Sequence, residues 1–65
     1  MQQEIGTAAG VIWNRLKENG ESSVAQLKKA TKLESPVFDW AIGWLAREDA
    51  VVINPNKRSY AIRLK

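Results

Sequence analysis

Apolar side chains recur at helical spacing in the first third of the chain. Between residues 5 and 16 they return every three or four positions, which predicts a helix over residues 3–18. Asn19-Gly20 follows, and both residue types tolerate the left-handed conformation that closes a helix. The positions expected to face the core are Ile5, Ala8, Ala9, Ile12 and Leu16.

A second, shorter helix is predicted from Ser23 to Thr31. Ser23 and Gln26 match a capping box, in which the serine hydroxyl accepts a backbone N–H and the glutamine amide reaches back to the cap. The side chains expected to face the core are Val24 and Leu27, with Ala30 as a third candidate, and those expected to face water are Lys28, Lys29 and Lys32.

A third helix is predicted to begin at Ser35-Pro36 and to end near Glu48-Asp49. Serine caps helices well, and the fixed φ of proline suits the first helical turn. Leu33 is expected to fill the turn before it. The inward stripe of this helix is expected to be Phe38, Ala41, Ile42 and Leu45.

The pattern changes to that of strands after residue 50. The β-branched run 51–53 predicts one strand, and residues 54–57 predict a type I turn with asparagine first and proline second. Tyr60, Ile62 and Leu64 then alternate with polar or small residues, which predicts a strand with one buried face. A further short strand near residues 21–23 could lie beside this hairpin.

The predicted order of elements is helix, short helix, helix and hairpin. Two helices joined by a brief turn match a helix-turn-helix, and a hairpin directly after it is a wing. We therefore expect an α+β winged helix-turn-helix fold, three helices followed by a β-hairpin wing, in a single domain over residues 1–65.

Three segments support this expectation by resemblance. IGTAAGVIWNRL, SSVAQLKKATKL and AIGWLARED resemble a family of small bacterial and archaeal winged helix-turn-helix proteins. The similarity covers residues 4–53, and the wing matches only by type. The resemblance implies the fold strongly and a function weakly, and it brings no catalytic residues.

Composition excludes several kinds of chemistry. The 65 residues include no cysteine and no histidine, which excludes disulfides, ordinary zinc sites and the usual catalytic bases. Glu48 and Asp49 are adjacent and point in different directions, and no glycine-rich phosphate loop follows a strand. We expect a protein that is not an enzyme, with no cofactor and no small-molecule substrate.

Length and hydropathy bear on partners and location. A domain this small buries only about 60% of its unfolded surface, so association with a partner subunit is one way to gain stability. No apolar run is long enough for a transmembrane span, and MQQEIGT lacks the basic and apolar regions of a signal peptide. We expect a cytoplasmic protein with no membrane partner.

Positive charge is unevenly distributed. Residues 1–49 hold six basic and seven acidic residues, for −1, whereas residues 50–65 hold four basic residues and no acid, for +4. This asymmetry favours contact with phosphate, although a solvated charged surface is the alternative. The candidate nucleic-acid-binding residues are Lys28, Lys29, Lys32, Arg47, Lys57 and Arg58.

The outward face of the third helix is unusual for a DNA-reading helix. Arg47 is its only side chain suited to base edges, and Asp39 has the wrong sign for phosphates. Trp40 and Trp44 are four residues apart, so they lie on one side of the helix. For Trp44 and for Trp13 the preferred interpretation is packing in the core, and exposure on the flank of the helix is the alternative for Trp44. The candidate dimer-interface residues are Trp40, Gly43, Trp44 and Arg47.

Two functions follow from these features. By fold analogy, the first is a DNA-binding or transcription-regulatory winged-helix module, with duplex DNA as its partner. The alternative is a protein–protein interaction module that forms a homodimer through the third helix, without sequence-specific DNA binding. The two conflict if that helix is buried between subunits, and they are compatible if a dimer presents both wings on one side.

Overall fold

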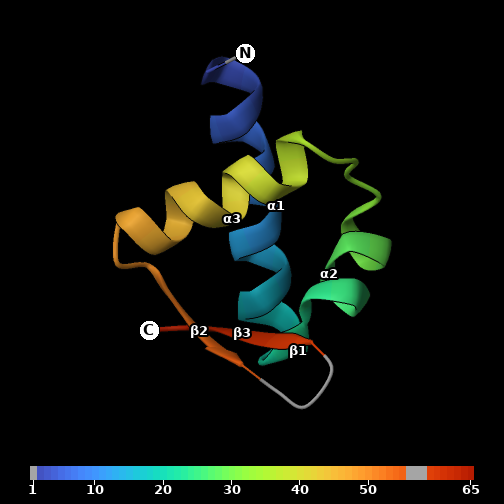
Figure 1. The fold of residues 1–65 in the computed structure, drawn as a ribbon, viewed down its shortest axis with the longest axis vertical. Helices are drawn as coiled ribbons and strands as arrows, with labels where there is room; N and C mark the ends of the chain where they lie inside the picture. Colours follow the sequence, from blue (N-terminus) through green and yellow to red (C-terminus); the bar gives the residue numbers. More distant parts are fainter. Residues whose placement is uncertain (1, 56–58) are drawn as a thin grey trace.

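A computed structural model describes residues 2–55 and 59–65 of the chain (Figure 1). The elements in chain order are α1 (Gln2–Asn19), β1 (Ser22–Ser23), α2 (Val24–Thr31), α3 (Val37–Arg47), β2 (Val51–Pro55) and β3 (Tyr60–Leu64). Three helices precede a hairpin, and β1 adds a third strand. The predicted winged helix-turn-helix architecture is confirmed, including the short strand near residues 21–23.

The strands form an antiparallel sheet in the order β1-β3-β2. Ser22 of β1 and Ile53 of β2 both lie opposite Ile62 of β3. Directly opposed residues in an antiparallel pair share one face of the sheet. Ile62 is fully buried, so this shared face is the one that packs on the helices.

The core forms where α3 crosses α1. In Figure 1 the first turns of α1 extend beyond α3, while α2 and the sheet surround the other end of α1. Ile5 is only partly buried, whereas the other predicted core positions of α1 are fully buried. The buried cluster consists of Ala8, Ala9, Ile12, Leu16, Leu27, Phe38, Ala41, Leu45, Val51 and Ile62.

Two of the predicted helix ends are confirmed. Gly20 has a φ of +76°, and its N–H donates to the Leu16 carbonyl at 2.8 Å, which ends α1 at Asn19. At the start of α2, the Gln26 N–H donates to the Ser23 hydroxyl at 3.1 Å, and the Ser23 N–H donates to the Gln26 side-chain oxygen at 3.2 Å. This is the capping box expected from the sequence.

The predicted start of the third helix is wrong by one residue. Pro36, not Ser35, occupies the N-cap of α3, and no side chain caps it. The Ser35 hydroxyl instead accepts a hydrogen bond from the Lys28 ammonium at 2.7 Å. The Phe38 N–H donates to the Glu34 carbonyl at 2.9 Å, so a backbone acceptor takes the role expected of the serine.

The inward stripe of α2 also differs from the prediction. Ala30 is exposed, whereas Thr31 is partly buried and its hydroxyl donates to the Leu27 carbonyl at 2.8 Å. The inward positions are therefore Val24, Leu27 and Thr31, spaced three and four residues apart. Thr31 fits because this hydrogen bond satisfies its hydroxyl near the core.

The hairpin is longer than predicted. Asn54 and Pro55 do not begin a turn but continue β2, opposite Ala61 and Tyr60. Tyr60, expected to be buried, is 55% exposed. The short β1 pairs only with the middle of β3, so the outer end of the hairpin has little to pack against. The rest of the predicted turn, residues 56 and 57, lies outside the described residues.

Over residues 2–55 and 59–65, none of the helices combines the length and the apolar character needed to cross a membrane.

The packing of α1 against α3 predicts different effects on stability for substitutions at two neighbouring positions of α1. Ile12→Val is expected to lower the free energy of unfolding by about 0.5–1.5 kcal/mol, because Ile12 is fully buried and a removed methyl group leaves a void. Val11→Ala is the control, since Val11 is exposed, and it should change stability by less than about 0.5 kcal/mol. Urea denaturation followed by circular dichroism measures both. Equal losses in the two variants would contradict this core.

Candidate functional site

The outward face of α3 carries the residues that the sequence singled out. Asp39, Gly43 and Arg47 are all exposed, and the tryptophans lie on the adjoining flank. Trp40 is 46% exposed and Trp44 is 45% exposed. Phe38, Ala41 and Leu45 occupy the opposite, buried side. The four candidate dimer-interface residues are therefore all exposed. Their role in a dimer stays a prediction.

Trp44 does not pack in the core, so the preferred interpretation of the sequence is wrong for this residue. It lines an open hollow of about 280 Å³ together with Gln2, Ile5 and Gly6 of α1. The α1 residues of this lining belong to the first turns of that helix, which extend beyond α3 in Figure 1. At the edge of the hollow, 45% of the Trp44 surface remains accessible.

Trp13 is also more exposed than predicted. The sequence places it in the core, but 36% of its surface is accessible. The Lys17 ammonium lies 5.3 Å from the centre of the Trp13 ring, within the range of a cation–π contact. The two residues are four apart on α1, so helical geometry brings them together. Lys17 therefore covers part of the ring that the core leaves exposed.

The α2 lysines lie on an element that carries no acid. Lys28, Lys29 and Lys32 are all exposed, and no Asp or Glu occurs between residues 22 and 33. Lys28 reaches the turn before α3 through its hydrogen bond to Ser35. Lys32 is the C-cap of α2, with a left-handed φ of 60°. The three ammonium groups thus extend from α2 to the start of α3.

The hairpin adds cations that the predicted set omits. Arg63 is exposed in the central strand β3, and Lys65 makes an ion pair with Asp49 just after α3. The alternation of residues 60–65 was the available signal, because it places Arg63 on the face turned away from the core. The predicted wing residues Lys57 and Arg58 lie outside the described residues.

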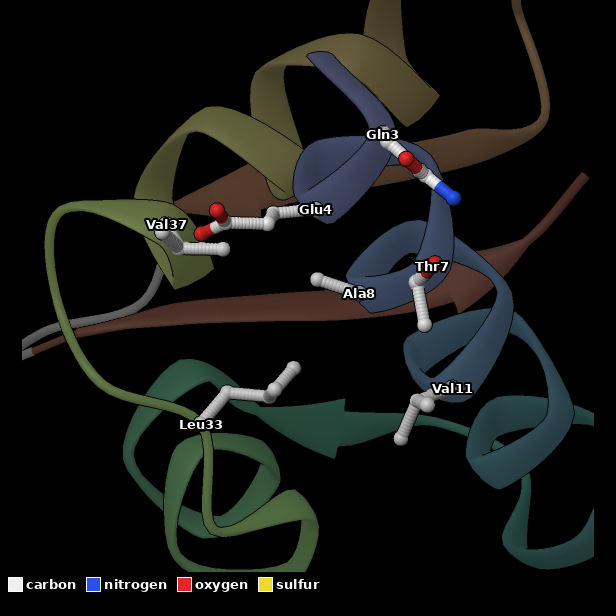
Figure 2. A pocket seen from close by; sticks show the side chains of 7 residues that line it. All are labelled: Gln3, Glu4, Thr7, Ala8, Val11, Leu33 and Val37. Atoms are coloured by element: carbon white, nitrogen blue, oxygen red, sulfur yellow. The ribbon is translucent and has the colours of Figure 1, made fainter. Parts of the chain in front are cut away.

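A second hollow lies beside α1, between it and the segment that joins α2 to α3 (Figure 2). It measures about 480 Å³, and Figure 2 shows Leu33 pointing toward Ala8 and Glu4 pointing toward Val37. Among the described residues of this lining, Glu4 is the only titratable one. Thr7 supplies a hydroxyl to the same lining, but no hydrogen bond joins it to the Glu4 carboxylate, so this pair is a poor basis for catalysis. The residues that line this second hollow are Gln3, Glu4, Thr7, Ala8, Val11, Leu33 and Val37.

Three glycines lie within the helices, and none is required by the described fold. At Gly6, Gly10 and Gly43 an added Cβ would meet no atom within 4 Å. Glycine inside a helix costs about 1 kcal/mol relative to alanine. No packing within the described part of the chain offsets this cost.

The fold and these surfaces define a small winged helix-turn-helix protein with a basic α2, a hairpin of the wing type and a tryptophan-bearing third helix. The chain belongs to the family described as "Winged helix-turn-helix domain (DUF2582)", whose model matches residues 1–64. The resemblance inferred from the sequence is thereby confirmed.

Two known proteins are similar over nearly the whole chain. Uncharacterized protein MJ1608 of Methanocaldococcus jannaschii is 40% identical over 68 residues, which cover 100% of this chain and 96% of the relative. The solution NMR structure of protein BT2368 from Bacteroides thetaiotaomicron has a TM-score of 0.84 at 32% identity, over 97% of this chain and 77% of that one. The fold of this chain therefore resembles that of a structure solved independently by NMR.

The open space around the helical glycines leads to a prediction about stability. Gly10→Ala is expected to raise the free energy of unfolding by about 0.5–1 kcal/mol, because alanine is the better helix former and the space around Gly10 is open. Urea denaturation of the purified variant measures the change. A loss of stability would show that Gly10 touches something in the folded protein.

Proposed function

We propose that the protein is a winged-helix module that binds duplex nucleic acid through phosphate contacts, with little reading of the bases. The winged helix-turn-helix family supports nucleic-acid binding as a class of function. The finer statement, that backbone contacts dominate, rests on the distribution of charge over this chain.

Segregation of charge is the observation that carries the proposal. The segment 22–33 has three lysines and no acid, and residues 50–65 have four cations and no acid. These segments are joined in space, because β1 leads directly into α2 and pairs with β3. The acids lie instead in α1, in α3 and in the connections around the basic segments. Among the described residues, this joined region carries four cations that make no ion pair there, Lys28, Lys29, Lys32 and Arg63, whereas Lys65 pairs with Asp49. Cations gathered in this way attract the phosphate backbone.

The composition of α3 argues against sequence-specific recognition. Bases are read in the major groove by arginine, lysine, asparagine or glutamine, and the exposed face of α3 offers only Arg47. Asp39 lies in the first turn of α3, where it would repel phosphates. Binding of this kind depends strongly on salt and weakly on sequence.

We also propose that the protein has no catalytic activity. Winged-helix domains are typically binding modules, and this chain has neither histidine nor cysteine. Both hollows are open, and among their described lining residues neither brings two acids together or holds a nucleophile in a hydrogen bond to a base.

Duplex binding tests the leading proposal. A variant with Lys28, Lys29 and Lys32 all replaced by glutamine should bind more weakly at low salt. Its slope of log affinity against log salt should be smaller in magnitude by about 0.9 for each phosphate that these lysines neutralise in the wild type. Fluorescence anisotropy with two unrelated duplexes of equal length measures this, and the wild type should bind both with similar affinity.

Lys17→Gln is the matched control for this experiment. It removes the same kind of charge from α1, where Lys17 lies over Trp13, and should leave the salt slope unchanged. An absence of wild-type binding at low salt would contradict the proposal. A strong preference for one duplex would contradict its claim about the bases.

A second candidate function, homodimerisation through α3, is favoured by a specific observation. Trp40 and Trp44 each leave nearly half of their surface exposed on one flank of α3. Tryptophan and arginine are among the residues most enriched at the centres of interfaces. Burying these rings between two copies would add apolar contact to a chain whose own core is small.

Removal of one ring tests the second candidate. Trp40→Ala is expected to weaken self-association by at least about tenfold, because interface tryptophans are typical hot spots. Trp13→Ala removes an exposed ring from α1 and is the matched control, with association expected to stay at the wild-type level. Sedimentation equilibrium over a concentration series measures both. Equal association of wild type and Trp40→Ala would exclude Trp40 as an anchor.

A further inference from the structure

Three residues of α3 are spaced symmetrically along its exposed face. Asp39, Gly43 and Arg47 are four residues apart, and all three are exposed. Each step of four residues advances the position by about 6 Å and rotates it by about 40°. The three positions therefore form one stripe about 12 Å long, with an acid at one end, a base at the other and a glycine in the middle.

Neither charge is matched within the described chain. The only ion pair there joins Lys65 and Asp49, so Asp39 and Arg47 have no ionic partner among residues 2–55 and 59–65. Both charges complement the dipole of α3, with the acid in the first turn and the base in the last. That effect explains their signs, but it explains neither Gly43 between them nor the exposed tryptophans beside them.

Gly43 is the weakest helix former on this stripe, and its surroundings are empty. An added Cβ would meet no atom within 4 Å, so packing within the described chain does not select glycine here. In Figure 1 α3 crosses α1, and none of the other described elements is drawn across it. A glycine in the middle of an exposed helix face allows a second helix to approach closely.

We propose that α3 is the contact between two copies of this chain, crossing its counterpart antiparallel at Gly43, with Asp39 of each copy facing Arg47 of the other. This inference rests on the second candidate function, and it adds the partner element, the polarity and the register. In a two-fold contact, residue i meets residue j and j meets i. A two-fold axis at Gly43 pairs position 39 with position 47, so the acid meets the base twice.

The same axis places the tryptophans together. An axis perpendicular to both helices keeps the same flank of each helix on the same side of the crossing. Trp40 and Trp44 of both copies therefore gather on one side, the side where Trp44 and the start of α1 line the open hollow. The contact thus combines two ion pairs, a close approach at glycine and an apolar cluster.

The arrangement also bears on nucleic-acid binding. An α3 occupied by a second copy is withdrawn from any groove, which leaves α2 and the hairpin as the basic elements of each copy. This agrees with an α3 face that is poor in base-reading side chains. Each copy in the dimer would keep its own basic surface.

Complementary charge reversal tests the register. Asp39→Lys alone places two pairs of like charges across the axis, and so does Arg47→Glu alone, so each variant should self-associate at least about tenfold more weakly. In an equimolar mixture, one copy of each variant can combine into a mixed dimer. There the unchanged Asp39 and Arg47 form one pair of opposite charges, and the two substituted residues face each other as a second such pair. The mixture should form mixed dimers in preference to either homodimer, and native mass spectrometry distinguishes the three species. The chain carrying both substitutions should form homodimers again.

The outcomes separate the register from the dimer itself. A monomeric wild type overturns both the second candidate function and this inference. A dimeric wild type whose single variants and mixture associate equally overturns only the register. A merely structural role of the charges, through the helix dipole, would lower the stability of each variant but would not produce selective mixed dimers.

Glycine substitutions supply an independent measurement. Gly43→Gln should raise the stability of the monomer to denaturation at low protein concentration, because glutamine is the better helix former. The same change should weaken association at least about tenfold, because two side chains would meet at the axis. Gly10→Gln makes the matched change on α1 and should raise monomer stability without weakening association. Equal association of both variants would overturn the close approach at Gly43.

Discussion

The packing of α3 across α1 is the interaction on which the rest of the structure depends. Ile12 of α1 and Phe38 and Ala41 of α3 are all fully buried in one cluster. A helix has one inner face, so burying this stripe determines which residues of α3 remain outside. Three features follow from that single contact. Trp40 and Trp44 are exposed, the hollow lined by Trp44 stays open, and the stripe centred on Gly43 faces outward.

The surface divides into two parts with different physical character. The elements β1, α2, β2 and β3 contain no acid, and α2 and β3 contribute basic residues, Lys28 and Lys29 from α2 and Arg63 from β3. The outer side of α3 is aromatic and carries one charge of each sign. A surface of one sign suits a uniformly charged polymer, whereas a balanced aromatic surface suits a partner with the same features. The proposed functions assign one partner to each part.

Local signals in the sequence were reliable wherever the interaction they describe is itself local. The helical spacing of the α1 apolar residues, the Ser23–Gln26 capping box and the left-handed Gly20 all appear as expected. The serine expected to cap α3 does not do so: its hydroxyl accepts from Lys28, while the Glu34 carbonyl accepts the Phe38 N–H. The expected turn at Asn54 failed because pairing with Ala61 continues the strand. In this second case a contact between separate parts of the chain overrode a local preference.

The sequence by itself determined the order of elements, the buried faces of α1 and α3 and the separation of acidic from basic segments, because each depends on spacing along the chain. Only the tertiary structure decided how far the tryptophans are covered. Periodicity places Trp13 and Trp44 at the border of the buried arc, where a small change in the crossing of two helices exposes or covers a ring. The tertiary structure also decided that α2 joins the hairpin through the pairing of β1 with β3, since strand pairing depends on where the chain returns in space.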